Sequence, residues 1–144
     1  MNWKHALQQA RERNLTKQYA ACRDFGVPQK RYSDKTANGL TACILDFLKY
    51  RGHYANRINT TGLPRIIKGK VIRTRGASNC GTADIHALIK GRFISIEIKI
   101  GQDRMSCAQQ KEKARVEASG GTYITVKTME QLYSWYEENF GVVS

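Results

Sequence analysis

The fold of this 144-residue chain is decided by residues 81–99, which read GTADIHALIKGRFISIEIK. The pattern predicts two β-strands joined by a tight turn at Lys90-Gly91-Arg92. In the second strand, successive side chains point to opposite faces of a sheet. One face carries isoleucines and is expected to pack into a core: Ile94, Ile96, Ile98 and Ile100. The opposite face carries Phe93, Ser95, Glu97 and Lys99.

Two carboxylates and an ammonium group are expected to converge at one end of this hairpin. Asp84 lies near the start of the first strand, and a hairpin brings that position close to Glu97 and Lys99 at the end of the second. Neighbouring carboxylates repel each other unless a cation lies between them, and hard oxygen ligands suit Mg²⁺ or Mn²⁺. Lys99 could then hold a phosphate or an attacking water. The alternative is an ordinary surface strand that carries a Glu–Lys pair.

A longer series of ordered motifs surrounds these residues. They are Gly81-Thr82-Ala83-Asp84-Ile85, Gly91-Arg92-Phe93, Ile96-Glu97-Ile98-Lys99, Gly101-Gln102-Asp103-Arg104-Met105-Ser106, Gln109, and Gly120-Gly121-Thr122-Tyr123. Asp84 followed after twelve residues by Glu97-Ile98-Lys99 resembles the PD-(D/E)xK nuclease superfamily, and the wider series resembles its VRR-NUC branch. The resemblance covers residues 36–128, and some small stand-alone viral and phage members of this branch resolve Holliday junctions.

The resemblance implies a metal-dependent nuclease. It implies that Asp84 and Glu97 bind the metal, that Lys99 polarises the nucleophile or stabilises developing charge, and that Gln109 helps to position phosphate or water. It also implies a 5′-phosphate product and a homodimer that cuts two opposed strands. Many relatives carry a further glutamate where this chain has Thr41, so the number of metal ions stays open. Ser106 and Gln109 also fit a capping box, which would give Gln109 a structural role instead.

The charge of the chain is strongly asymmetric. Its net charge of +12 lies within residues 1–83, whereas residues 84–144 are neutral overall. No acid lies between Asp46 and Asp84, which indicates that this region binds a phosphate backbone rather than serving solubility alone. Arg57 is either a phosphate ligand or an ordinary strand-end residue. The residues expected to contact nucleic acid are Arg57, Arg65, Lys68, Lys70, Arg73, Arg75, Ser78 and Arg104.

The remaining segments complete an α/β pattern. Helices are expected at 3–14, 16–23, 40–50, 106–119 and 129–139, and strands at 53–58, 71–75 and 122–126. Residues 1–35 form a basic helical extension that packs on the core, exchanges with a partner subunit or contacts DNA. Residues 36–144 are expected to form the nuclease domain that the resemblance implies. The expected fold is a restriction-endonuclease-like core: a mixed central β-sheet flanked by helices.

The expected function is a Mg²⁺-dependent DNA endonuclease, with Mn²⁺ as a substitute, acting on branched DNA such as a Holliday junction. A non-catalytic DNA-binding module, a flap-cutting or nicking enzyme, and an RNA-directed nuclease remain alternatives. The chain has no long apolar run and no signal-peptide pattern, and its four cysteines show no Cys-x-x-Cys spacing. We therefore expect free thiols, no membrane partner and a cytoplasmic location in a bacterial or phage-infected cell.

Overall fold

The structure is a computed structural model that describes residues 2–58, 64–73 and 80–141. The helices are α1 (Trp3–Gln18), α2 (Ala20–Phe25), α3 (Ala37–Tyr50), α4 (Cys107–Ala118) and α5 (Met129–Phe140). The strands are β1 (Tyr54–Arg57), β2 (Pro64–Ile67), β3 (Lys70–Arg73), β4 (Ile85–Ile89), β5 (Arg92–Ile98) and β6 (Thr122–Val126). Within these residues, no helix is both long enough and apolar enough to cross a membrane.

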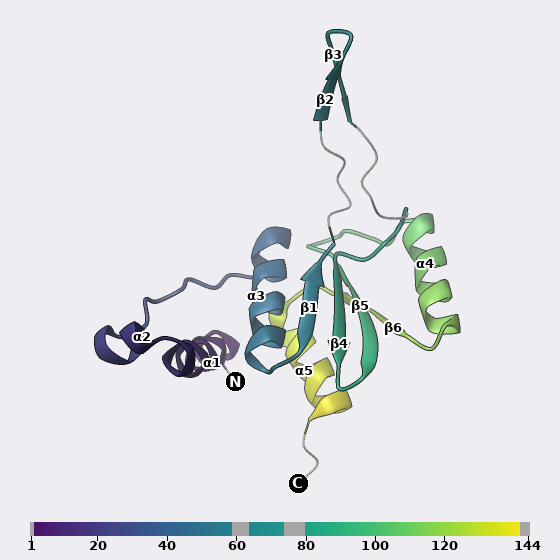
Figure 1. The fold of residues 1–144 in the computed structure, drawn as a ribbon. Coiled ribbons are helices and arrows are strands. Elements are labelled where there is room, and N and C mark those ends of the chain that lie inside the picture. The colour runs from purple at the N-terminus through teal and green to yellow at the C-terminus, as the bar shows by residue number, and fades with distance from the viewer. Residues whose placement is uncertain (1, 59–63, 74–79, 142–144) are drawn as a thin grey trace.

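A mixed four-stranded sheet forms the centre of the molecule (Figure 1). Its strand order is β1-β4-β5-β6. The β1–β4 and β4–β5 pairs are antiparallel, and the β5–β6 pair is parallel. The predicted β4–β5 hairpin is confirmed, and its two-residue turn uses Lys90 and Gly91 at positive φ values of 47° and 80°. Such paired left-handed residues match the natural twist of a tight hairpin.

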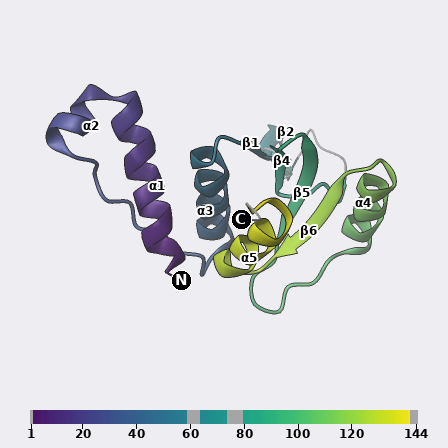
Figure 2. The ribbon, with the colours of Figure 1, turned by 90° about the horizontal axis from the view of Figure 1, so that it is seen from below.

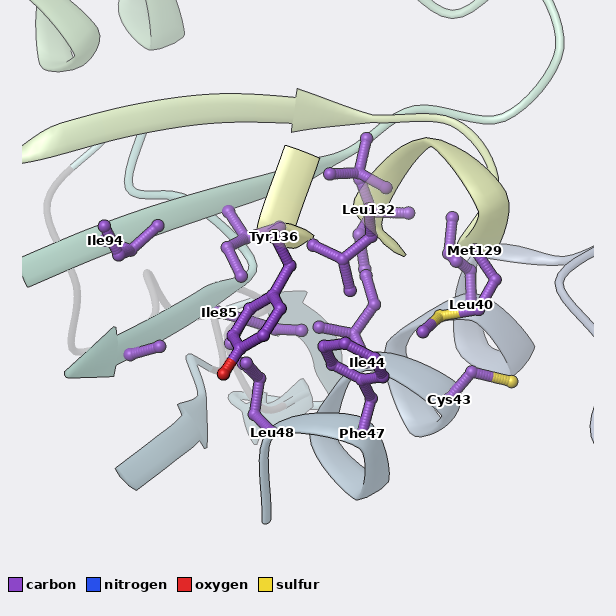
Figure 3. Close-up of a cluster of buried hydrophobic side chains, with 14 of the residues drawn as sticks. Leu40, Cys43, Ile44, Phe47, Leu48, Ile85, Ile94, Met129, Leu132 and Tyr136 are labelled. Carbon is purple, nitrogen blue, oxygen red and sulfur yellow. The ribbon is translucent and has the colours of Figure 1, made fainter. Parts of the chain in front are cut away.

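The apolar face of this sheet packs on α3 and α5 (Figure 3). Helix α3 begins at the Thr36 cap, whose hydroxyl accepts a hydrogen bond of 3.1 Å from the Gly39 amide. From there Leu40, Ile44, Phe47 and Leu48 lie along one side of the helix and are buried. They meet the isoleucines of β4 and β5 in one hydrophobic cluster, as the periodic apolar pattern of both segments predicts.

Helix α4 covers part of the opposite face of the sheet, so the structure has α3 and α5 on one side and α4 on the other (Figure 2). This layer buries Ser95 and Glu97, which point away from the isoleucine core. The Val116 side chain of α4 approaches Gly121 so closely that a Cβ added there would lie 2.8 Å from it. The sheet is therefore sandwiched at β5 and β6, and Glu97 is not on an open surface.

The N-terminal extension differs in detail from the prediction. Helix α1 continues through the expected break at Asn14–Thr16 and ends at Gln18, because Tyr19 adopts an extended conformation. The carbonyl of Thr16 instead accepts a hydrogen bond of 3.0 Å from Arg23, on α2. In Figure 2, α1 lies against the side of α3 that faces away from the sheet. Leu7 of α1 is only 3% exposed and belongs to the main hydrophobic cluster.

Replacing Leu7 with alanine tests whether the extension contributes to the stability of the whole chain. We expect Leu7→Ala to lower the free energy of unfolding by about 2–5 kcal/mol, because it removes buried methyl groups and leaves a cavity. Phe25, which is 89% exposed on α2, is the control, and Phe25→Ala should change the value by about 0.5 kcal/mol or less. Urea denaturation measures both. Equal stability of the two variants would show that α1 does not pack on the core.

Candidate active site

Asp84 and Glu97 are brought together by the register of β4 and β5. Ile85 pairs with Ile96, so Asp84, just before β4, lies across from the end of β5. The Asp84 carboxylate accepts a hydrogen bond of 2.8 Å from the backbone amide of Ile98. The Asp84 carbonyl accepts another, also of 2.8 Å, from the Ile58 amide after β1. Asp84 is thus held between two neighbouring strands, with its side chain directed toward the Glu97 segment.

Glu97 is only 3% exposed, and its carboxylate is surrounded by three side-chain donors. Lys99 places its ammonium nitrogen 3.1 Å from Oε1 of Glu97. The side-chain amide of Gln109, on α4, donates to the same oxygen. The Tyr123 hydroxyl, on β6, donates to Oε2 at 3.4 Å. This set partly compensates the cost of burying a carboxylate.

The electrostatic balance at Glu97 still opposes ionisation. Burial raises the pKa of the Glu97 carboxyl above its usual range, and the Asp84 charge raises it further. Lys99, followed by Tyr123, offsets part of this rise in the pKa. The pair of carboxylates is therefore a site where an added cation would relieve both repulsion and desolvation. Carboxylate oxygens are also the ligands that Mg²⁺ and Mn²⁺ prefer, so these residues fit such an ion.

Gln109 forms the capping box that its spacing from Ser106 predicts, and its side chain also contacts Glu97. Its side-chain Oε1 accepts a hydrogen bond of 2.9 Å from the Ser106 backbone amide, and its backbone amide donates to the Ser106 hydroxyl at 3.2 Å. This is the predicted capping box of α4. The Nε2 of the same side chain donates to Glu97. One amide group therefore starts the helix and orients the carboxylate.

Tyr123 is a site residue to which sequence reasoning gave no role beyond its place in a motif. Its hydroxyl is buried, and burial together with the Glu97 charge raises the pKa of the phenol, so it remains a protonated donor. The parallel β5–β6 pairing places Tyr123 opposite Ser95 and Thr125 opposite Glu97. The alternation in residues 122–126 could have shown that Tyr123 shares a face with Glu97, but only once the pairing of β5 with β6 was known.

The segment before β4 is fixed against α4 by Gly81. Its φ of +86° is in the left-handed region, where residues other than glycine are strained. A Cβ at this position would lie 2.3 Å from the carbonyl oxygen of Ala108 and 2.8 Å from the amide nitrogen of Gln109. This close approach of two backbones sets the distance between the Asp84 loop and the first turn of α4.

Neither Thr41 nor Asp46 adds a third acid. Thr41 is buried in α3, and its hydroxyl donates to the Ala37 carbonyl at 2.7 Å. Asp46 accepts hydrogen bonds from Lys30 at 2.6 Å and from the Tyr32 hydroxyl at 2.8 Å, so it ties the extension to α3. In residues 2–58, 64–73 and 80–141, no group of three or more His, Cys, Asp or Glu side chains is arranged to hold a metal ion.

The predicted nucleic-acid contacts that the structure describes lie in three separate parts of the chain. Arg57 ends β1 and donates to the Asn38 side chain at 2.9 Å, at the start of α3. Arg104 is exposed in the loop that joins β5 to α4. The exposed residues Arg65, Lys68 and Lys70 belong to the separate β2–β3 hairpin. Arg73 ends β3, but its side chain lies outside the described part of the chain, as do residues Arg75 and Ser78.

The raised pKa of Glu97 predicts a pH-dependent stability that depends on this one residue. Between the ordinary glutamate pKa and the raised one, the folded chain still holds the Glu97 proton, whereas the unfolded chain has released it. The stability of the folded state therefore falls as the pH rises through this range. In metal-free buffer, we expect the melting temperature of Glu97→Gln to lose this decline. Each kcal/mol of stability corresponds to about 2–4 °C in a chain of this size. Glu138→Gln, at an exposed residue of α5, should follow the wild type. Parallel pH profiles for wild type and Glu97→Gln would contradict the expectation.

Comparison with known proteins does not assign the chain to a family or give its site a function. No protein-family model matches the chain, and no curated protein matches it significantly. The roles of Asp84, Glu97, Lys99 and Gln109 therefore have to be argued from their positions and chemistry.

Proposed function

We propose that this chain is a metal-dependent DNA endonuclease with a restriction-endonuclease-like core of the PD-(D/E)xK type. The observation that carries the proposal is the convergence of Asp84, Glu97, Lys99 and Gln109 at one edge of the central sheet. A structural Glu–Lys pair would need neither the second carboxylate nor the amide from α4. The mixed sheet between α3 and α4 is also what the resemblance to the VRR-NUC branch implies.

The metal ion would be held by Asp84 and Glu97. Both supply oxygen ligands. Burial, followed by the Asp84 charge, raises the pKa of Glu97, and a cation at this place would relieve both effects. A bound Mg²⁺ or Mn²⁺ supplies Lewis-acid chemistry: it acidifies water and neutralises charge on phosphate oxygens. Gln109 and Tyr123 would keep the Glu97 carboxylate in one orientation during this process.

Lys99 would act on the phosphate. Its ammonium group is largely buried and lies beside Glu97, so it can donate to a non-bridging oxygen or to the attacking water. Positive charge in a partly desolvated site stabilises the negative charge that develops as water adds to phosphorus. The water loses a proton and its oxygen bonds to phosphorus, while the bond between phosphorus and the 3′ oxygen breaks. The 3′ oxygen leaves and takes up a proton to become a 3′-hydroxyl on one fragment, and the phosphate remains on the 5′ end of the other.

The preferred substrate in this proposal is branched DNA, and two copies of the chain would cut opposed strands. The dense positive charge of residues 1–83 supports a polyanionic ligand. A single carboxylate site cuts one strand at a time, so symmetric cleavage of a junction requires paired sites, as in a two-fold dimer.

The metal site can be tested without any nuclease assay. At a Mn²⁺ concentration about 100 times the dissociation constant, binding to the folded state alone adds about 2.7 kcal/mol of stability. We expect this gain in melting temperature for the wild type, and its loss in Asp84→Asn and Glu97→Gln. Glu138→Gln should keep it. A gain of the same size in all four proteins would place the bound ion elsewhere.

Cleavage assays test the activity itself. We expect wild type with Mg²⁺ to cut a labelled four-way junction at paired symmetric positions, and not a matched linear duplex. Asp84→Ala and Glu97→Gln should bind the junction without cutting it, and Lys99→Ala should be slower by about 10²–10³-fold. Lys127→Ala, at an exposed residue beyond β6, is the matched control.

Three results would change this proposal. Cleavage of a 5′ flap or of all substrates would retain the nuclease and exclude the junction preference. Cleavage of RNA in place of DNA would change the substrate class. Binding without cutting in Mg²⁺ and Mn²⁺ would favour a non-catalytic DNA-binding module, for which the lack of a third acid near Thr41 is the observation in favour.

A further inference from the structure

The β2–β3 hairpin stands apart from the central sheet (Figure 1). Its strands pair in register from Pro64 with Arg73 to Ile67 with Lys70. Lys68 and Gly69 form the turn with φ values of 50° and 74°, the paired left-handed geometry of a tight hairpin. A two-stranded hairpin without a packed face is marginally stable in water. The hairpin therefore has a defined shape but leaves its side chains without a core.

Large apolar side chains on this hairpin are exposed. Ile66 and Val71 face each other across the two strands and are 78% and 72% exposed. On the other face, Ile67 and Ile72 are 47% and 45% exposed. Exposed apolar groups gathered on one small element indicate a binding surface, because they are unfavourable in water and favour aggregation.

The charge of the hairpin identifies the kind of partner. Residues 64–73 contain four basic side chains and no acid: Arg65, Lys68, Lys70 and Arg73. Two copies of such a hairpin would repel each other, so self-association through this element is disfavoured. A polyanion with apolar surfaces between its charges fits both features, and nucleic acid has phosphates next to base faces and sugars.

The location of the hairpin relates it to the candidate active site. In the chain it lies between Arg57, which ends β1, and Asp84, which precedes β4. The Ile58 amide donates to the Asp84 carbonyl at 2.8 Å, so these two residues on either side of the hairpin in the chain lie together beside the carboxylates. A two-stranded ribbon has the width to enter a groove of DNA. The hairpin is thus connected to the part of the sheet that holds Asp84 and Glu97, and DNA bound by it would have to extend from the hairpin to the carboxylates.

We propose that residues 64–73 form a DNA-probing arm, whose Ile66–Val71 pair contacts base faces at a branch point while its cations bind the adjoining phosphates. This inference rests on the proposed function and adds the origin of its preference for branched DNA. In a linear duplex, stacking covers the base faces, and apolar side chains must unstack a step to reach them. At a branch point the stack is interrupted, so the same contact requires less unstacking.

The test separates the apolar pair from the charges. One variant is Ile66→Thr/Val71→Thr, which keeps β-branched residues in both strands and adds hydroxyl groups. The second is Arg65→Gln/Lys68→Gln/Lys70→Gln. The control is Phe25→Ser, an exposed apolar residue on α2. Binding to a four-way junction and to a linear duplex of the same sequence is measured in metal-free buffer, with 2-aminopurine at the branch point.

We expect the apolar variant to lose about tenfold in junction affinity and the 2-aminopurine signal, while its duplex affinity stays within about twofold. The charge variant should lose affinity for both DNAs alike, and its log–log salt slope should fall by about 0.9 for each phosphate contact removed. Phe25→Ser should match the wild type. Because every substituted side chain is exposed, we expect the melting temperatures of all three variants to match that of the wild type.

Three outcomes would overturn the arm. The first is unchanged affinity of Ile66→Thr/Val71→Thr for both DNAs, and the second is an equal loss of affinity for both. The third is conversion of a dimer to a monomer by this variant in sedimentation, which would make the hairpin a protein interface. Because these assays measure binding, a wild type that discriminates between the DNAs but never cuts would reject the nuclease and retain the arm. If the wild type cuts DNA and Ile66→Thr/Val71→Thr keeps the preference for the junction, the nuclease would be retained and the arm rejected.

Discussion

The candidate site depends on the burial of the Glu97 carboxylate beneath α4. An ionised carboxylate in such a place needs hydrogen-bond donors or a cation. The donors are Lys99, just after β5, Gln109 on α4 and Tyr123 on β6. Two of them also have a part in the fold: Gln109 caps a helix, and Tyr123 lies in the parallel strand pair. The same residues therefore hold α4 and β6 against the sheet and supply the hydrogen bonds to Glu97. A change in the position of α4 would alter both.

The acidic pair and the basic part of the chain have opposite requirements. A polyanion is attracted by residues 1–83 but is repelled by Asp84 and Glu97 at the place where it would react. Lys99 offsets part of this repulsion, and a divalent cation between the carboxylates would reverse it. The hairpin of residues 64–73 carries positive charge outward from the same edge, so the anionic ligand can bind at a distance from the acids. In the proposed function, attraction of DNA and its cleavage would therefore belong to adjacent but separate parts of the chain.

Local sequence patterns predicted most of the strands and helices, and long-range packing explains what they did not predict. The alternation in residues 92–98 and the apolar stripe of 40–48 gave β5 and α3, and hairpin geometry placed Asp84 beside Glu97. The burial of Ser95 and Glu97 was not predicted, because a polar face usually meets solvent and α4 is distant in sequence. Tyr123 was given no role because parallel pairing has no local turn signal. The break expected at Asn14 was wrong, since burial of Leu7 and the contacts of α1 outweigh weak helix propensities.

Gly81 illustrates how a mutational survey would report this site. It has no side chain and makes no chemical contribution. Every amino-acid substitution that a single-nucleotide change of a glycine codon can produce nevertheless adds a Cβ. At Gly81 that atom would collide with the backbone of Ala108 and Gln109, and the left-handed φ would add strain. In a random library, position 81 would thus tolerate as few substitutions as the acids themselves. Ranking positions by tolerance alone would count this backbone contact as a catalytic residue.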